Sequence, residues 1–333
     1  MMKKFKKIAL FVALFLGVAH GASAQDVIFS QFYANPLYLN PAFAGSKVCP
    51  RISLNYRSQW PSLVSAFTTV SASYDQYIDG MHGGIGAILL TDRQGDHGAL
   101  STSSFSAMYA FRFQLARDIW VNAGLKAGIV NTSLDWANLR FPDMIDNVTG
   151  FTGMTSAQMP EHTNKWYLDF DAGALIYGSS WYVGFAAAHL TQPSNGFYGI
   201  TKLPIKLTGN VGALINIAEE ARRTSSLGLG TPVLSPNFIY QYQAGFHYFN
   251  YGLYLDWMPF LVGVWYRNGI ENPDAFIFMV GAQHDYFKIG YSYDVTVSEL
   301  SNSTAGSHEI TLGILLPVPE QKHKIKAIRC PSF

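Results

Sequence analysis

The stretch of sequence that decides the fold is FKIGYSYDVTVSELSNSTAGSHEITLGILL, residues 287–316. Apolar and polar residues alternate along its first part. The apolar set is Phe287, Ile289, Tyr291, Tyr293 and Val295, and the polar set is Lys288, Gly290, Ser292 and Asp294. After the polar residues 298–307, the alternation resumes with Ile310, Leu312 and Ile314. A period of two indicates extended strands with one apolar and one polar face, so the stretch predicts a β-hairpin.

The composition decides where the apolar face of this hairpin lies. In water it would need a protein core, whereas in an outer membrane it meets lipid while the polar face lines a barrel lumen. The chain of 333 residues is 49% hydrophobic, 15% aromatic and only 14% charged, and soluble domains are about a quarter charged. These proportions favour the lipid-facing barrel over a soluble β-sandwich. The formal net charge of +1 gives no support to a nucleic-acid partner.

Similar alternation recurs along the chain and predicts an all-β transmembrane antiparallel β-barrel of about 14 strands over residues 51–316. The clearest runs are residues 52–57, 105–114, 121–131, 166–174, 205–216 and 240–248, the last of which we interpret as a single strand. Residues 172–201 contain no Asp, Glu, Lys or Arg, which resembles a membrane helix. Two alternating runs meet at Gly178-Ser179, however, so we predict a tight hairpin there. An even strand number puts both termini in the periplasm.

The same strand count places the loops 132–164 and 298–307 outside the cell. It puts the polar segment 218–235 on the periplasmic side, where turns are usually short, and the role of this segment stays open. Residues 1–24 have the basic start, apolar run and Ala22-Ser23-Ala24 site of a signal peptide. Residues 25–50 then form an N-terminal leader, periplasmic or lumenal, and residues 317–333 a basic periplasmic tail.

Two motifs at opposite ends of the mature chain carry a family resemblance. The first is Phe29-Ser-Gln-Phe-Tyr through Asn35-Pro-Leu-Tyr-Leu-Asn-Pro-Ala-Phe-Ala-Gly45, followed by Asn55-Tyr-Arg-Ser-Gln-Trp-Pro61. The second comprises Gly290-Tyr-Ser-Tyr-Asp294, Gly306-Ser-His-Glu-Ile310 and the terminal Ile328-Arg-Cys-Pro-Ser-Phe333. Together they resemble the PorP/SprF membrane proteins of the type IX secretion system.

The resemblance implies an outer-membrane barrel of a Bacteroidetes-type bacterium that works with secretion and gliding machinery. It implies that the protein helps to secrete or anchor a surface protein with a C-terminal sorting domain. The implied partners are that cargo, periplasmic or lipoprotein components of the machinery, and outer-membrane lipid. A porin or solute channel is the alternative function, and an outer-membrane hydrolase is a distant third.

Three groups of residues are candidates for function. The leader is a candidate partner-binding surface, or it simply closes the barrel; its residues are Phe29, Gln31, Asn35, Pro36, Leu37, Asn40, Pro41 and Gly45. Cys49 and Cys330 either form a disulfide, which an exported compartment permits, or remain unpaired thiols. The tail either docks an acidic periplasmic partner or is solvated; its basic residues are Lys322, Lys324, Lys326 and Arg329.

The sequence predicts no enzyme, cofactor or metal site. His308-Glu309 lacks the second histidine of a zinc-binding HExxH helix and lies in an alternating run, so both are expected at the rim or in the lumen. Asp143 and Asp146 offer oxygen ligands for a weak calcium site in the loop 132–164. Solvated loop charge is the simpler interpretation of both aspartates.

Overall fold

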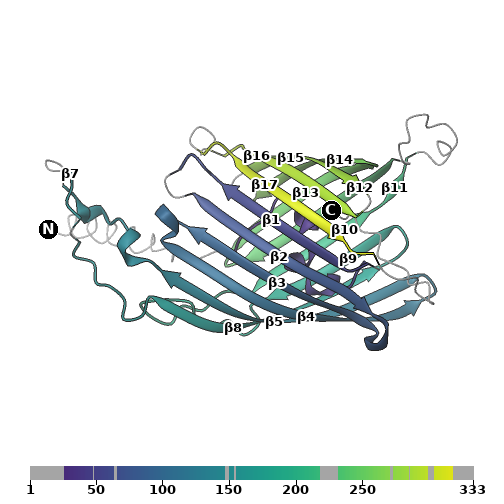
Figure 1. Cartoon of the computed structure of the whole chain (residues 1–333), viewed down its shortest axis with the longest axis horizontal. Coiled ribbons are helices and arrows are strands. Elements are labelled where there is room, and N and C mark those ends of the chain that lie inside the picture. The colour runs from purple at the N-terminus through teal and green to yellow at the C-terminus, as the bar shows by residue number, and fades with distance from the viewer. Residues whose placement is uncertain are drawn as a thin grey trace, which may run out of the picture.

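The protein is described by a computed structural model that covers residues 26–47, 49–63, 66–146, 150–153, 155–217, 232–270, 273–284, 286–298 and 304–317. Within these residues fourteen antiparallel strands form one closed barrel, which confirms the predicted fold class (Figure 1). The strands are β1 (Arg51–Gln59), β2 (Phe67–Ile78), β3 (Gly83–Gln94), β4 (Leu100–Ala116), β5 (Ile119–Leu134), β8 (Asn164–Tyr177), β9 (Trp181–Ala188), β10 (Lys206–Ala213), β12 (Val233–Gln243), β13 (Phe246–Trp257), β14 (Phe260–Gly269), β15 (Pro273–His284), β16 (Phe287–Thr296) and β17 (Ser307–Leu315).

Neighbouring strands in the chain are neighbours in the barrel. Two pairings close the ring: β1 pairs with β17, and β10 pairs with β12 across the intervening short strand β11 (Ile215–Asn216). The described parts of the chain contain no helix long and apolar enough to cross a lipid bilayer.

The hairpin β16–β17 shows why the sequence folds in this way. Phe287, Ile289 and Tyr291 are exposed on the outer surface of the barrel, whereas Lys288 and Asp294 are buried inside it. The predicted alternation therefore sets the two faces of the wall, with the apolar side chains outside, where they meet lipid.

The connections between strands fall on two rims. The rim where β1 begins and β17 ends is called the terminal rim, and the opposite one the loop rim. The long β5–β8 connection and the β16–β17 connection lie on the loop rim, as the strand count predicted. The β5–β8 connection also carries a small hairpin, β6 (Ile145–Asp146) with β7 (Gly150–Phe151). The β10–β12 connection lies on the terminal rim; residues 218–231 of the predicted insertion are outside the described residues.

One strand prediction was wrong. Residues 240–248 are not one strand, because the chain turns at Ala244-Gly245 between β12 and β13. Both turn residues have positive φ, 55° and 87°, as a two-residue hairpin turn requires. A turn of two residues preserves the alternation of period two, so the pattern runs through the turn without a visible break.

Residues 26–47 lie inside the barrel, and Figure 1 shows this purple segment between the walls. It contains three short helical turns: η1 (Phe32–Ala34), α2 (Pro36–Leu39) and η2 (Pro41–Phe43). The remaining short 3-10 turns lie in connections between strands: η3 (Asp79–Met81), η4 (Asp96–Gly98), η5 (Trp136–Asn138) and η6 (Pro142–Met144). The leader and the inner wall therefore share one core.

Candidate functional site: the leader in the lumen

The two Asn-Pro pairs of the leader shape its turns. Pro36 and Pro41 occupy the first positions of α2 and η2, where the missing backbone N–H costs nothing. The Asn40 side chain accepts a hydrogen bond of 2.9 Å from the Ala42 N–H and so caps η2. Asn40 also donates to the carbonyl oxygens of Ala174 and Phe185 on the wall, at 3.2 and 3.1 Å. Asn40 therefore both caps η2 and binds the leader to the wall.

An apolar patch on the inner wall receives the apolar side chains of the leader. The leader contributes Phe32, Tyr33, Ala34, Leu39, Ala42 and Phe43, and the wall contributes Leu175, Tyr177, Tyr182, Ile239, Tyr254, Trp265, Ile277 and Met279. All of these residues are at most 6% exposed. A lumen-facing wall that carries so many apolar residues requires a partner inside the barrel.

An arginine cluster, Arg57 with Asp294 and Glu309, holds the next part of the leader. Arg57 lies 3.0 Å from Asp294 Oδ2 and 3.2 Å from Glu309 Oε2. The backbone N–H groups of Ser30 and Gln31 donate to the Glu309 carboxylate at 2.7 and 3.2 Å. All five residues are at most 2% exposed. The two buried carboxylates are therefore partnered by Arg57, by the leader and, at Asp294, also by Arg267 at 3.3 Å.

The end of the leader passes close to β3. Gly45 has φ +63°, and a Cβ atom there would lie 2.5 Å from the Gly84 Cα, so neither position has space for a side chain. The Gly45 N–H donates to Asp75 Oδ2 at 2.9 Å, and Arg112 donates to the Gly45 carbonyl at 2.8 Å. Asp75 is itself paired with Arg51 at the start of β1.

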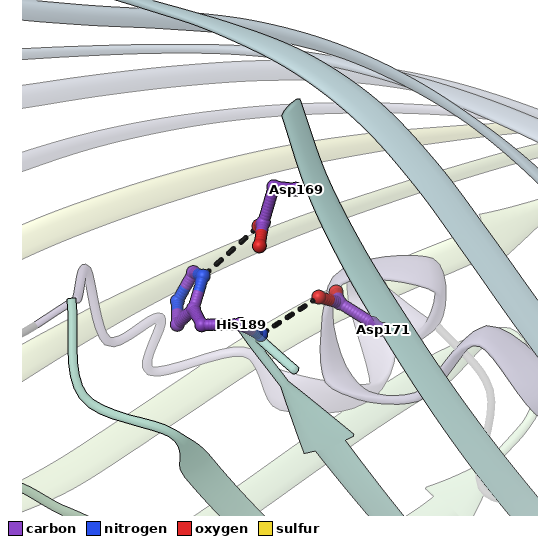
Figure 2. A group of neighbouring side chains, drawn as sticks. All are labelled: Asp169, Asp171 and His189. Carbon is purple, nitrogen blue, oxygen red and sulfur yellow. Dashed lines mark hydrogen bonds and ion pairs between the residues drawn. The ribbon is translucent and has the colours of Figure 1, made fainter. Parts of the chain in front are cut away.

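A histidine cluster holds the other end of the leader. His189, directly after β9, lies between two carboxylates: Nδ1 is 2.9 Å from Asp169 Oδ2, and Nε2 is 2.8 Å from Asp26 Oδ2. Its backbone N–H donates to Asp171 Oδ1 at 3.1 Å. Figure 2 shows Asp169 and Asp171 projecting from β8 toward His189. Burial alone would lower the pKa of His189, but the charge of Asp26 and the two carboxylate hydrogen bonds raise it to about 10.

Ligand atoms of Asp169, Asp171 and His189 all lie within 4.8 Å of one another, as metal ligands would. The donor chemistry favours ion pairs instead. Both ring nitrogens of His189 face carboxylates and act as donors, which leaves no lone pair for a metal ion. Lys126 contacts the other oxygen of Asp171. This cluster is therefore best described as a network of ion pairs between the leader and the wall.

A cavity of about 390 Å³ lies beside the histidine cluster. Its lining combines leader residues with residues of β3, β4, β5, β8, β9 and β10, and it includes Asp26, Lys126, Asp169, His189 and Lys206. It extends to Asn195, Phe197 and Leu203 in the β9–β10 connection on the loop rim. The leader thus forms one side of a chamber of mixed polar and apolar lining near the loop rim. Asp26 lies toward this rim, whereas the strand count predicted the N-terminal end on the opposite side of the barrel.

The structure brings all the candidate leader residues together. Phe29, Gln31, Asn35, Pro36, Leu37, Asn40, Pro41 and Gly45 are all buried against the wall. In this state they contact the barrel, so a partner reaches them only if the leader withdraws. Cys49 is half-buried, while Cys330 and the tail residues Lys322, Lys324, Lys326 and Arg329 lie outside the described residues. The disulfide and the docking tail therefore stay predictions.

The remaining candidates have ordinary structural roles. Glu309 is buried in the lumen, and His308 accepts or donates a hydrogen bond of 2.8 Å with the Tyr291 hydroxyl. Asp143 organises its own loop, since it accepts hydrogen bonds from Thr155 and Ser156. The bond from the Ser156 backbone is the main cause that lowers the pKa of Asp143.

Sequence reasoning missed the histidine cluster as a unit. The alternation around residues 166–174 correctly put Asp169 and Asp171 on the polar face. His189 gave no local signal, because it follows a run of three alanines and its partner Asp26 lies 163 residues away. A charged residue on the polar face of several neighbouring strands is the one signal that points to such a cluster.

A family model described as "Type IX secretion system membrane protein PorP/SprF" matches residues 21–314. No curated protein sequence matches the chain. Among solved structures, the Ralstonia pickettii toluene transporter TbuX aligns with 9% identity and a TM-score of 0.47, over 89% of this chain and 95% of that one. The Acinetobacter baumannii outer membrane protein Omp33 aligns with 6% identity and a TM-score of 0.44, over 81% and 99%.

Proposed function

Because the chain belongs to the PorP/SprF family of type IX secretion system membrane proteins, and is an outer-membrane β-barrel, we propose that it acts through protein–protein contacts. In this proposal it helps to secrete or anchor a surface protein that carries a C-terminal sorting domain. Family membership already implies contact with components of the secretion machinery. The kind of cargo, a surface protein with a C-terminal sorting domain, is what the proposal adds.

The observation that carries the proposal is the filled lumen. Leader residues Phe32, Tyr33 and Phe43 are at most 4% exposed, because they pack on the apolar patch of the inner wall. A solute channel needs an aqueous path through this region, whereas a barrel that acts by contact does not. Exposed apolar residues on the loop rim, such as Phe151, Tyr198 and Ile200, offer contact area away from the lipid-facing wall.

A periplasmic contact belongs to the same proposal. The tail from residue 317 onward carries Lys322, Lys324, Lys326 and Arg329, and these side chains would attract an acidic surface of a periplasmic or lipoprotein component. Replacing the four by Gln should reduce recovery of that component while the barrel still inserts into the membrane. Unchanged recovery would contradict the docking role of the tail.

The test is capture of the tagged protein from native outer membranes in mild detergent, followed by mass spectrometry. The proposal expects a large surface protein with a sorting domain, or secretion components, at higher yield than with an unrelated tagged barrel. The second candidate function is a porin, which the 390 Å³ chamber favours because it leaves space inside the barrel. Recovery of the barrel alone, together with clear ion conductance in a planar bilayer, would replace the first proposal by the second.

A further inference from the structure

The Asp26 carboxylate is bound by three donors from three separate parts of the wall. His189 Nε2 lies 2.8 Å from Oδ2, Lys206 Nζ lies 3.5 Å from the same oxygen, and Gln243 Nε2 donates to Oδ1 at 3.1 Å. The Gln243 side chain also accepts from the Asp26 N–H at 3.0 Å. Charge-assisted hydrogen bonds that converge on one carboxylate are the features of an anion-binding site.

We propose that His189, Lys206 and Gln243 form a carboxylate-binding site for an acidic side chain of an extended peptide, and that Asp26 is its built-in occupant. The peptide enters from the chamber on the loop rim and takes the place of Asp26. This site is separate from the proposed secretion role, because it rests only on the contacts of the histidine cluster and the cavity beside it.

Residues 26–28, called the limb below, carry the occupant Asp26 and are attached more weakly than the rest of the leader. Asp26, Val27 and Ile28 are only half-buried and have no regular secondary structure, whereas burial is nearly complete from Phe29 onward. Among the described residues, and apart from the contacts of Asp26, the polar attachment of this limb is one hydrogen bond of 2.6 Å from the Tyr38 hydroxyl to the Val27 carbonyl, and its apolar attachment is the packing of the partly buried Ile28 on the core. The limb can therefore leave while residues 29–44 stay in the lumen.

Charge balance favours an acidic replacement. In the ion-pair network, protonated His189, Lys126 and Lys206 face Asp26, Asp169 and Asp171, so the charges of these six groups cancel. The carboxylate of Asp92 also lines the chamber, where it accepts hydrogen bonds from Thr69 and Gln94 and lies outside this network. When Asp26 leaves, one positive charge at Lys206 is uncompensated in a largely buried place, which is costly. Lys206 is only 7% exposed. An incoming carboxylate restores the balance, whereas an incoming cation or neutral chain does not.

The chamber provides room for the ligand. Its volume of about 390 Å³ lies in the usual range for ligand pockets, roughly 300–1,000 Å³. Asp26, His189 and Lys206 all line it, so a group in the chamber reaches the carboxylate site directly. The present occupant of the three donors is itself part of a peptide chain, residues 26–28, and this is why we assign the site to a peptide and not to a small free carboxylate.

The test measures binding of a fluorescent peptide with the sequence of residues 25–30, QDVIFS, to the full chain in detergent. D26N should bind the peptide about tenfold more tightly than the unaltered protein, because the built-in competitor has lost its charge. Adding K206M to D26N should remove this gain, and so should the Asp-to-Asn form of the peptide. Adding K165M should not, because Lys165 contacts Ser194 and Gly196 on the loop rim and does not line the chamber.

Each variant is first checked for the heat-dependent shift in gel mobility that a folded barrel gives. Equal binding by D26N and the unaltered protein would overturn the site, and so would full binding by D26N with K206M. Glutarate that displaces the peptide at the peptide's own concentration would overturn the assignment to a peptide in favour of a small carboxylate.

Discussion

Arg57 joins two buried carboxylates of the inner wall. The residue is 1% exposed and its guanidinium lies between Asp294 and Glu309, while the backbone N–H groups of Ser30 and Gln31 in the leader also donate to Glu309. R57M keeps the packing volume but leaves buried carboxylates with fewer partners. We expect the free energy of unfolding to fall by about 3–5 kcal/mol, as for other broken buried pairs, measured by urea titration of the folded barrel.

Arg140 supplies the matched control for this change. It pairs with Asp96 at 3.1 Å, but its side chain is 65% exposed on the loop rim. R140M should therefore change the free energy of unfolding by less than about 1 kcal/mol. Similar losses for R57M and R140M would show that burial of the arginine cluster does not matter for stability.

The pair of Asp26 and His189 should make the attachment of the leader depend on pH. Burial opposes the charge of His189, but Asp26 and Asp169 raise its pKa from 6.5 to about 10. A raised pKa means that the stabilisation is complete below pH 6.5 and is lost as the pH rises toward 10. Burial also opposes the charge of Asp26, but Lys206 and His189 lower its pKa, so its contribution is lost as the pH falls below 3.8.

The difference in unfolding free energy between the unaltered protein and D26N contains the contacts of Asp26 with His189, Lys206 and Gln243, and its change with pH reports the pair with His189. It should be largest between about pH 4 and 6.5 and should shrink as the pH is raised to 10. Urea titrations of both proteins at several pH values measure it. A difference that stays constant up to pH 10 would mean that His189 is not held in its charged form by Asp26.

At the residue scale, the sequence predicts which side chains point inward but not which of them meet. The alternation around Asp294 and Asp169 is enough to place both in the lumen, because the period of a strand is two. The contacts of Asp26 with His189, and of Ser30 with Glu309, join residues 163 and 279 positions apart. These contacts depend on barrel closure and on the path of the leader, which no local pattern contains.

At the scale of elements, the leader and β3 fit together because two glycines meet. In G84A the added Cβ would lie 2.2 Å from the Ala44 carbonyl oxygen and 2.5 Å from the Gly45 Cα, both backbone atoms. Since the backbone cannot move aside cheaply, we expect a loss of about 1–3 kcal/mol in unfolding free energy. Hydrogen–deuterium exchange in peptides covering residues 26–47 should become faster.

Gly80 is the control for this substitution. It lies in η3 between β2 and β3, and a Cβ atom there would meet nothing within 4 Å. G80A should change the free energy of unfolding by no more than about 0.5 kcal/mol and leave exchange in the leader unchanged. If G84A behaves like G80A, the leader is not seated against β3 in solution.

Two tight turns show which strand boundaries can be predicted from the sequence. Gly178-Ser179 was recognised as a hairpin, and β8 indeed ends at Tyr177 while β9 begins at Trp181. Ala244-Gly245 was missed, because a two-residue turn keeps the alternation in phase. Hairpins with tight turns are therefore visible only where the turn residues themselves stand out, as the Gly-Ser-Ser run does.

At the scale of the whole molecule, the alternating strands and the low content of charged residues were enough to predict a barrel, but the filling of the lumen was not predictable. The inner wall carries Tyr182, Ile239, Tyr254, Trp265, Ile277 and Met279, which in the sequence look like interruptions of the polar face. Their position on the inner wall is explained by the apolar side chains of the leader that pack against them. The apolar residues of the inner wall and the leader therefore form one packed core that fills the lumen.

Removal of the leader tests directly whether this core seals the lumen. A chain that lacks residues 26–44 keeps every barrel strand, and its strand pairings do not involve the leader. We expect it to remain a folded barrel with a heat-dependent mobility shift, and to conduct ions in a planar bilayer well above the unaltered protein, because a barrel of this size can hold an aqueous path. Adding a synthetic peptide of residues 26–47 should lower the conductance again. Equally high conductance of the unaltered and shortened proteins would mean that the leader does not seal the lumen, and the solute-channel function would then be the better explanation of the barrel.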